Sequence, residues 1–310
     1  MSDSTSDGSP RSPKPKVVYV MGAGRSGSTI LGVLLGNCAE VFFAGELYKW
    51  LPRAGEPTLK DPRRTEFWRA VRMRLAPVLP IAGGAAHRAL ERSSGLFRPD
   101  GARARRLLRA PYRQLTGELF GAIAASAGAA YVVDTSHYPL RARELQAIDE
   151  IELYVLLLVR DPQDVVASFA REDVAERQFS PLTTRAYLLL TYLLSAWVFL
   201  RQPAERRLTL FYEDLLDDPA GVLRTLLDDL GSSAAVPDFD SLATGLALHG
   251  NRLLASEVVS LQRRRSPHGT VGIGARVFAR LLSGALTQLR PRVTARSESA
   301  SVGSTQKPAR

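Results

Sequence analysis

Five short runs of β-branched and apolar residues recur along the chain. They lie at residues 17–21, 41–44, 131–134, 153–159 and 208–212. Runs of this length with little polar alternation are typical of strands buried on both faces of a sheet. The stretches between them predict helices at 28–37, through most of 67–127, and at 140–148, 162–171, 183–201 and 220–230. Alternating strands and helices predict an α/β fold with a parallel sheet of about five strands flanked by helices.

The predicted domain spans residues 17–289 and contains one irregular part. Residues 51–127 carry several Pro and Gly breaks and interrupt the alternation of strand and helix. We interpret them as a helical insertion over the carboxyl edge of the sheet, where such folds bind ligands. The polar ends of the chain, 1–16 and 290–310, lack periodicity and are predicted to be disordered tails.

No segment predicts a membrane span or a secretory signal. The longest uncharged run, 186–200, falls short of the roughly 20 residues that a transmembrane helix needs, so we interpret it as a buried core helix. The first 16 residues have no apolar core. A single cysteine excludes an intrachain disulfide, and the four histidines show no zinc-ligand spacing. We therefore expect a cytoplasmic protein without a structural metal.

The positive charge is concentrated in one segment. The formal net charge is +10, and residues 49–113 hold 16 Lys and Arg against 5 Asp and Glu. A local excess of this kind favours an anionic partner. Two interpretations stay open: a peripheral contact with a membrane surface or acidic ligand, and a solvated helical face rich in arginine. A nucleic-acid partner is not expected.

A glycine-rich turn joins the first strand to the first helix. It contains Gly22, Gly24 and Gly27 and continues through Ser28 and Thr29. Such a turn directs backbone N–H groups and the positive end of a helix dipole at one point, which suits a phosphate or sulfate. The sequence therefore predicts an anion-binding loop.

Two general fingerprints compete for this loop, and a third, given below, comes from a family resemblance. The glycines satisfy G-x-G-x-x-G, and Glu46 lies near the place of a ribose-binding acid, so a dinucleotide-binding oxidoreductase is one alternative. The Walker pattern is nearly met, but Ser28 replaces its lysine. Neither pattern explains Arg25 and Ser26. A guanidinium among hydroxyls suits a highly charged transferable group.

A second cluster follows the fourth predicted strand. Arg160 ends the strand, Asp161 is a predicted N-cap, and Pro162 takes the first helical position. Ser168 follows about two helical turns later. Arg160 and Ser168 can therefore hold one more phosphate from two sides.

These motifs resemble those of sulfotransferases that use 3'-phosphoadenosine 5'-phosphosulfate (PAPS). Residues 22–31 are similar to the family's 5'-phosphosulfate loop in its arginine-containing carbohydrate and tyrosyl-protein form, and residues 159–168 are similar to its 3'-phosphate motif. Weaker similarity reaches residues 249–251. The resemblance implies a P-loop-like fold, and it implies that PAPS is bound by Gly24, Arg25, Ser26, Gly27, Ser28, Thr29, Arg160 and Ser168.

The resemblance also implies catalytic roles. Glu46 takes the place of the base that removes the acceptor proton, and Arg25 neutralises the leaving group. Residues 134–137 depart from the D-S-S-K of many bacterial relatives because His137 replaces the lysine, which makes His137 an alternative base. The run Arg263 to Arg265 resembles the family's basic glycine motif only loosely, and a solvated charge run is the other interpretation.

The resemblance thus implies sulfuryl transfer from PAPS, with PAP as the product, to a hydroxyl of a carbohydrate, lipid-linked or natural-product acceptor. The alternative that is not an enzyme is a protein that binds anions or a membrane surface through residues 49–113. The sequence leaves the acceptor and the oligomeric state open.

Overall fold

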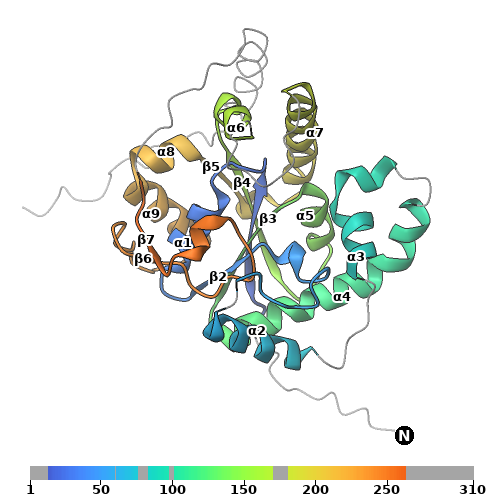
Figure 1. Ribbon diagram of the computed structural model, residues 1–310, viewed down its shortest axis with the longest axis horizontal. Coiled ribbons are helices and arrows are strands. Elements are labelled where there is room, and N and C mark those ends of the chain that lie inside the picture. Colours follow the sequence, from blue (N-terminus) through green and yellow to red (C-terminus); the bar gives the residue numbers. More distant parts are fainter. Residues whose placement is uncertain (1–12, 60, 76–82, 98–100, 170–180, 263–310) are drawn as a thin grey trace, which may run out of the picture.

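A computed structural model describes residues 13–59, 61–75, 83–97, 101–169 and 181–262. The predicted tails, apart from residues 13–16, and the run Arg263 to Arg265 lie outside these residues. Five strands form one parallel sheet: β1 (Lys16–Gly22), β2 (Val41–Gly45), β3 (Tyr131–His137), β4 (Glu152–Val159) and β5 (Arg207–Phe211). Their order is β2-β3-β1-β4-β5 (Figure 1). The predicted α/β class and the predicted strand number are confirmed.

Alternate side chains of β1 pack into two different hydrophobic cores, one on each face of the sheet. Val17, Tyr19 and Met21 of β1 pack into one cluster of buried side chains, and Val18 and Val20 pack into the other. Because side chains alternate across a strand, this division requires a cover of helices on both faces of the sheet.

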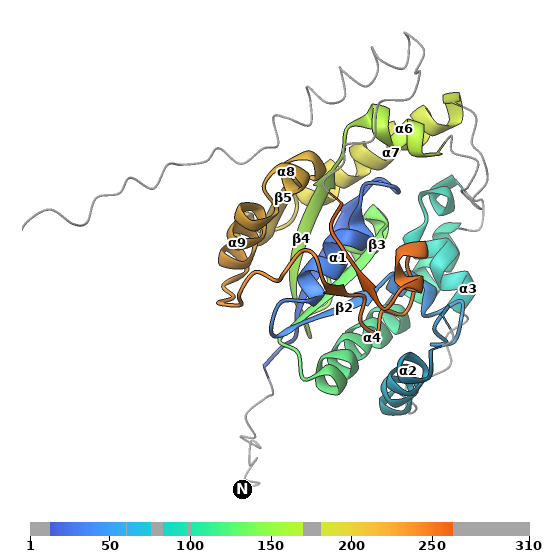
Figure 2. The same ribbon diagram turned by 60° about the vertical axis from the view of Figure 1, so that its left-hand side comes forward.

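One face is covered by α1 (Ser28–Gly36), α8 (Tyr212–Asp217) and α9 (Pro219–Leu230). The other face is covered by α2 (Pro62–Arg74), α4 (Gly101–Ala127), α5 (Pro139–Leu145), α6 (Pro162–Phe169) and α7 (Pro181–Phe199). Figure 2 shows α8 and α9 on the opposite side of the sheet from α2 and α4. The short elements are η1 (Leu47–Lys49), α3 (Gly83–Ala86), η3 (His87–Glu91), η4 (Ser93–Phe97), η5 (Ala204–Arg206), η6 (Arg252–Ala255), β6 (Leu242–Ala243) and β7 (Val258–Val259).

The insertion lies differently from the prediction. Its long helix α4 buries Leu119, Phe120 and Ile123 in the same core as Trp68 of α2, against a face of the sheet. An amphipathic helix must bury its apolar side, and the sheet face offers the larger apolar surface. Two parts of the insertion reach the carboxyl edge of the sheet: Thr58, whose hydroxyl lies 2.6 Å from Nδ1 of His249, and η3, where His87 stacks on Tyr48 with ring centroids 5.2 Å apart.

Helix α7 is only half buried, which corrects the prediction of a buried core helix. Leu188 and Val198 are fully buried, whereas Leu193 is 61% exposed and Trp197 is 41% exposed. Both faces of the helix are apolar, so the sequence pattern gave no sign of which side meets the core. Within the described ranges, no helix combines the length and hydrophobicity needed to cross a membrane.

Candidate active site

The two predicted anion motifs lie side by side because their strands are neighbours. β1 pairs with β4 along its whole length, and Gly22 lies opposite Leu158. Gly22 has a φ of 155°, and a Cβ there would lie 2.4 Å from the carbonyl oxygen of Leu158. Only glycine allows the chain to turn this close to β4. β2 and β3 lie on one side of β1, and β4 and β5 lie on the other, so the strand order changes direction at β1. Parallel α/β sheets bind ligands at the carboxyl ends of the strands at such a point.

The loop from Gly22 to α1 forms a nest of backbone donors. Arg25 and Gly27 both have left-handed backbone conformations, with φ of 68° and 93°. In the part of the chain that the structure describes, no protein acceptor takes the N–H groups of Arg25, Ser26 or Gly27. The N–H of Gly24 donates to the hydroxyl of Tyr187 at 2.9 Å. Successive free N–H groups at the start of a helix are the donor set that binds phosphate and sulfate.

The predicted residues of the second motif contact the loop directly. Nη1 of Arg160 donates to the carbonyl oxygen of Arg25 at 3.0 Å, and Nε of Arg25 donates to Oγ of Ser168 at 3.2 Å. The Arg160 guanidinium also lies over the ring of Tyr212, 4.8 Å from its centroid. The structure therefore brings Arg25, Arg160 and Ser168 together.

A buried polar atom beside this loop lacks a partner among the described residues. It is Nε of Arg160. A buried polar group left without a hydrogen bond carries a free-energy penalty, so its presence beside free N–H groups favours a ligand there. The donor set of the loop, two arginines and serine hydroxyls, suits a ligand with several negative charges.

The start of α6 is fixed as its sequence predicted. Oδ1 of Asp161 accepts from the N–H of Gln163 at 2.7 Å, so Asp161 is the N-cap and Pro162 is the first helical residue. The N–H of Asp161 donates to Glu213 of α8 at 2.9 Å. Arg160 is thereby held at a rigid junction between β4 and α6.

Glu46 follows β2 at the same edge of the sheet. Its N–H donates to the carbonyl oxygen of His249 at 2.9 Å, and its Oε2 lies 3.5 Å from Nε2 of His249. Nδ1 of His249 is 2.6 Å from the hydroxyl of Thr58. Burial, helped by the positive charges of Lys49 and Arg53, lowers the pKa of His249 to about 4. The imidazole beside Glu46 is therefore neutral at neutral pH.

His137, the alternative base, ends β3 in a left-handed conformation with a φ of 57°. Its ring stacks on Tyr138 with centroids 4.5 Å apart. Burial lowers the pKa of His137 to about 4, so the ring is neutral at neutral pH and a weak proton acceptor. The sequence gave no sign of this perturbation.

Aromatic rings gather next to Glu46. Tyr48 lies within ring-contact distance of three of the four histidines in the chain, namely His87, His137 and His249, at 5.2 to 6.4 Å between centroids. Tyr138 lies edge-on to the ring of Tyr48 at 5.0 Å. The surroundings of Glu46 are thus both apolar and hydrogen-bonding.

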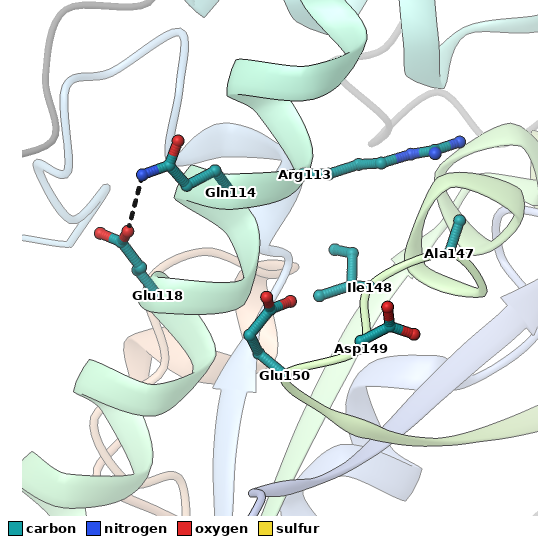
Figure 3. Close-up of a pocket in the computed structure, with 7 residues that line it drawn as sticks. All are labelled: Arg113, Gln114, Glu118, Ala147, Ile148, Asp149 and Glu150. Carbon is teal, nitrogen blue, oxygen red and sulfur yellow. Dashed lines mark hydrogen bonds between the residues drawn. The ribbon is translucent and has the colours of Figure 1, made fainter. Parts of the chain in front are cut away.

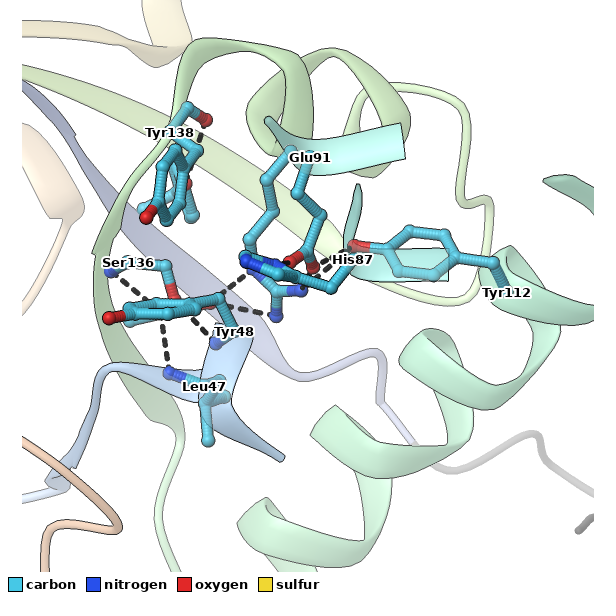
Figure 4. Close-up of polar contacts among 10 residues, drawn as sticks. Leu47, Tyr48, His87, Glu91, Tyr112, Ser136 and Tyr138 are labelled. Atoms are coloured by element: carbon cyan, nitrogen blue, oxygen red, sulfur yellow. Dashed lines mark hydrogen bonds and ion pairs between the residues drawn. The ribbon is translucent and has the colours of Figure 1, made fainter. Parts of the chain in front are cut away.

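A buried ionic network holds the turn that follows Glu46 (Figure 4). Oδ1 of Asp134 accepts from the N–H of Leu47 at 3.3 Å, and Oγ of Ser136 accepts from the N–H of Tyr48 at 2.9 Å. Nη2 of Arg141 pairs with Asp134 at 3.0 Å, and its Nη1 pairs with Glu91 of the insertion. The network ties the position of Glu46 to the insertion.

A separate small cavity of about 240 Å³ lies away from these residues (Figure 3). It is formed by α4 and the turn between α5 and β4, with Glu118, Asp149 and Glu150 among its lining residues. That turn leads into the amino end of β4, whereas the anion loop is at the carboxyl ends of the strands. The cavity is therefore not part of the candidate site.

Sequence reasoning missed His249, Thr58, Tyr187 and Tyr212. His249 stood in a short motif with weak similarity to the family, which was its only signal. Tyr212 explains the glycine at position 27, because a Cβ there would lie 2.3 Å from the tyrosine ring. Thr58 carried no signal, since a lone threonine is common in any loop.

A family model described as the sulfotransferase family matches residues 15–235. Among solved structures, the chain is similar to the sulfotransferase domain of the Synechococcus PCC 7002 olefin synthase, with 19% identity, a TM-score of 0.51, and coverage of 88% of this chain and 97% of that one. It is also similar to the sulfotransferase domain from the curacin biosynthetic pathway, with 20% identity, a TM-score of 0.45, and coverage of 85% and 83%. A comparison with curated proteins gave no match. The family match favours the sulfotransferase interpretation of the glycine-rich loop over the dinucleotide and Walker patterns.

Proposed function

The chain belongs to the sulfotransferase family, and from this premise we propose that it transfers a sulfuryl group from PAPS to a hydroxyl of its acceptor. The observation that carries the proposal is the loop at residues 24–29, where free N–H groups, Arg25 and Arg160 converge. The donor would supply an activated sulfuryl group and a phosphate leaving group. Residues of this chain would bind the donor, remove the acceptor proton and stabilise the transition state.

The residues present fit such a donor. The N–H groups of Arg25, Ser26 and Gly27 with the hydroxyls of Ser28 and Thr29 would hold the 5'-phosphosulfate. Arg160 and Ser168 would hold the 3'-phosphate. The buried Nε of Arg160, which lacks a partner among the described residues, supports this assignment because a phosphate oxygen would satisfy it.

We assign proton removal to Glu46. The family resemblance gives Glu46 the place of the base, and burial, which lowers the pKa of His137 to about 4, makes that imidazole a weak base at neutral pH. Glu46 lies at the same edge of the sheet as the loop, and its side chain is 16% exposed, which leaves it open to an acceptor hydroxyl. A pH–rate profile of Glu46→Gln beside His137→Ala tests this choice.

Arg25 would stabilise the transition state. Sulfuryl transfer resembles phosphoryl transfer in having a loose, in-line transition state, so positioning and charge stabilisation carry most of the catalysis. Ser168 accepts a hydrogen bond from Nε of Arg25, which leaves both Nη groups of the guanidinium for the leaving oxygen.

We propose a carbohydrate, lipid-linked or natural-product hydroxyl as the acceptor class. The rings of Tyr48 and Tyr138 next to Glu46 support an acceptor with an apolar face. The basic residues of 49–113 support an anionic acceptor or a membrane-peripheral protein in the cytoplasm. Transfer of ³⁵S from labelled PAPS to a panel of saccharides, glycolipids and phenols tests the class. Activity confined to phenols would overturn it.

The donor is tested by thermal shift with PAP, ADP and NAD at equal concentration. We expect PAP to raise Tm well above the other two, because only PAP carries the 3'-phosphate that Arg160 and Ser168 would bind. Equal shifts for the three nucleotides would refute the donor assignment. In the labelled assay, Glu46→Gln should lower turnover by roughly 10² to 10⁴ while PAP affinity stays nearly unchanged.

A further inference from the structure

His249 and Thr58 join Glu46 through a network of backbone hydrogen bonds. The N–H of Leu248 donates to the carbonyl oxygen of Ala44, the N–H of Glu46 donates to that of His249, and the N–H of Thr58 donates to that of Leu248, all at 2.9 to 3.0 Å. Gly45 makes this close approach feasible, since a Cβ there would lie 2.3 Å from the carbonyl oxygen of His249. Three distant segments are thus held in fixed register beside the candidate base.

The side chains continue the same arrangement. Nδ1 of His249 is 2.6 Å from Oγ1 of Thr58, and its Nε2 is 3.5 Å from Oε2 of Glu46. The second distance is long for a hydrogen bond, and contacts of this kind tighten when an active site is filled. Each ring nitrogen of His249 therefore faces one defined oxygen.

The charges around His249 fix its protonation state. Burial is the largest cause that lowers the pKa of His249 to about 4, and the positive charges of Lys49 and Arg53 lower it further. Glu46 faces its Nε2, and the ring of Tyr48 lies edge-on at 6.4 Å. At neutral pH the ring carries one proton, which sits on either Nδ1 or Nε2.

The two neighbouring oxygens decide between these tautomers. An ionised carboxylate only accepts hydrogen bonds, whereas a threonine hydroxyl can donate or accept. A proton on Nδ1 would leave the lone pair of Nε2 facing Glu46, which is repulsive. A proton on Nε2 satisfies the carboxylate, and Thr58 then donates its hydroxyl hydrogen to Nδ1.

We propose that Thr58 and His249 are positioning residues, in which the Thr58 hydroxyl fixes the tautomer of His249 so that Nε2–H donates to the Glu46 carboxylate. This inference rests on the proposed role of Glu46. One carboxylate oxygen, Oε2, is then held in a fixed orientation by His249. The neutral ring, a weak base, does not take the proton from Glu46 itself.

The tautomer can be read directly by long-range ¹H–¹⁵N spectra of the histidine rings in the full chain, which has four histidines. His249→Gln assigns the His249 signals. We expect a neutral Nε2–H tautomer at pH 7 in the wild type and in Thr58→Ser, which keeps the hydroxyl. Thr58→Val, which keeps the shape but not the hydroxyl, should shift the population toward Nδ1–H. An Nδ1–H tautomer in the wild type overturns the proposal.

The effect on Glu46 is measured by ¹³C titration of its carboxyl group, assigned with Glu46→Gln. Loss of one donor to the ionised form should raise the titration midpoint by about half to one pH unit in Thr58→Val. His249→Gln, whose amide nitrogen replaces Nε2, should keep the wild-type midpoint better than His249→Asn, whose amide nitrogen replaces Nδ1. An unchanged midpoint in both Thr58→Val and His249→Asn also overturns the proposal.

PAP binding serves as the folding control for every variant, since none of these residues lies in the predicted nucleotide site. A wild type that fails to bind PAP, or a Glu46→Gln variant with normal turnover, refutes the proposed function instead. The tautomer and the carboxyl titration remain measurable in that case, so the two failures are distinguishable.

Discussion

Arg141 is the cation between two fully buried carboxylates, and its replacement by methionine is a sharp test of the network. Arg141 is 2% exposed, and Glu91 and Asp134 are 0% exposed. Arg141→Met keeps most of the side-chain volume but leaves both carboxylates without their positive partner. We expect a loss of unfolding free energy of about 3 to 5 kcal/mol at pH 7, the range measured when one member of a buried ion pair is removed.

The remaining hydrogen bonds argue against a larger loss. Glu91 keeps the hydroxyl of Tyr112 at 2.6 Å and the ring of His87, and Asp134 keeps the backbone N–H groups of Leu47 and Ser136. Each carboxylate therefore stays partly solvated by the protein, as buried ions require.

The loss should depend on pH, with a definite sign. Burial by itself raises the pKa of Glu91, but Arg141 and His87 outweigh it and hold the pKa below its ordinary value. In the wild type, Glu91 thus contributes stability that is present above its unfolded pKa and is lost as pH falls through its folded pKa. Burial already raises the pKa of Asp134 in the wild type. Without Arg141 the pKa of both carboxyls rises, so the variant recovers relative to the wild type as pH falls from 7 toward about 4.

Urea denaturation followed by tryptophan fluorescence at pH 7 and pH 5 measures the effect. Arg109→Met is the matched control, because Arg109 is 42% exposed and its partner Glu144 keeps Arg113 at 2.7 Å. The control should lose less than about 1 kcal/mol. A loss in Arg141→Met as small as in the control, or equal losses at both pH values, would refute the reasoning.

Three further predictions concern the loop and α7. Arg160→Ala should weaken PAP binding by roughly 10- to 100-fold in calorimetry, because it removes a charge-assisted contact, and unchanged affinity would count against the 3'-phosphate assignment. Gly27→Ala should lower both Tm and PAP affinity, and Tyr212→Leu in the same chain should restore part of the Tm by removing the overlap at 2.3 Å. Leu193→Glu should change stability by no more than about 0.5 kcal/mol, whereas Leu188→Glu should unfold the chain; the reverse result would mean that α7 is turned the other way.

Much of the fold was predictable because buried parallel strands carry a strong local signal. The five apolar runs became five strands, and the turn chemistry of Gly22 and Asp161 located two helix starts. The strand order was not predictable, since it depends on which strands pair across long connections. That Arg25 and Arg160 bind one co-substrate was implied only by the resemblance of both motifs to one family, because no local pattern links residues so far apart.

The failure at α7 has a different cause. Leu189, Leu193, Trp197 and Leu200 are exposed, so the exposed side of this helix is as apolar as its buried side. Periodicity identifies a buried face only when the other face is polar. From its sequence, a helix with two apolar faces is therefore predicted to be fully buried. Only the packing of α5 and α6 against α7 shows which face is covered.

The part of the site that sequence missed is the part that depends on packing between distant segments. Glu46 is aligned on one side by His249 and on the other by Asp134 and Ser136, which hold the next turn. Asp134 in turn shares Arg141 with Glu91 of the insertion. A buried charge network must keep all its members in place, because loss of one leaves the others unpaired. The insertion is therefore coupled to Glu46 through this network, and substitutions at its buried polar residues should alter the position of Glu46 without affecting the glycine-rich loop.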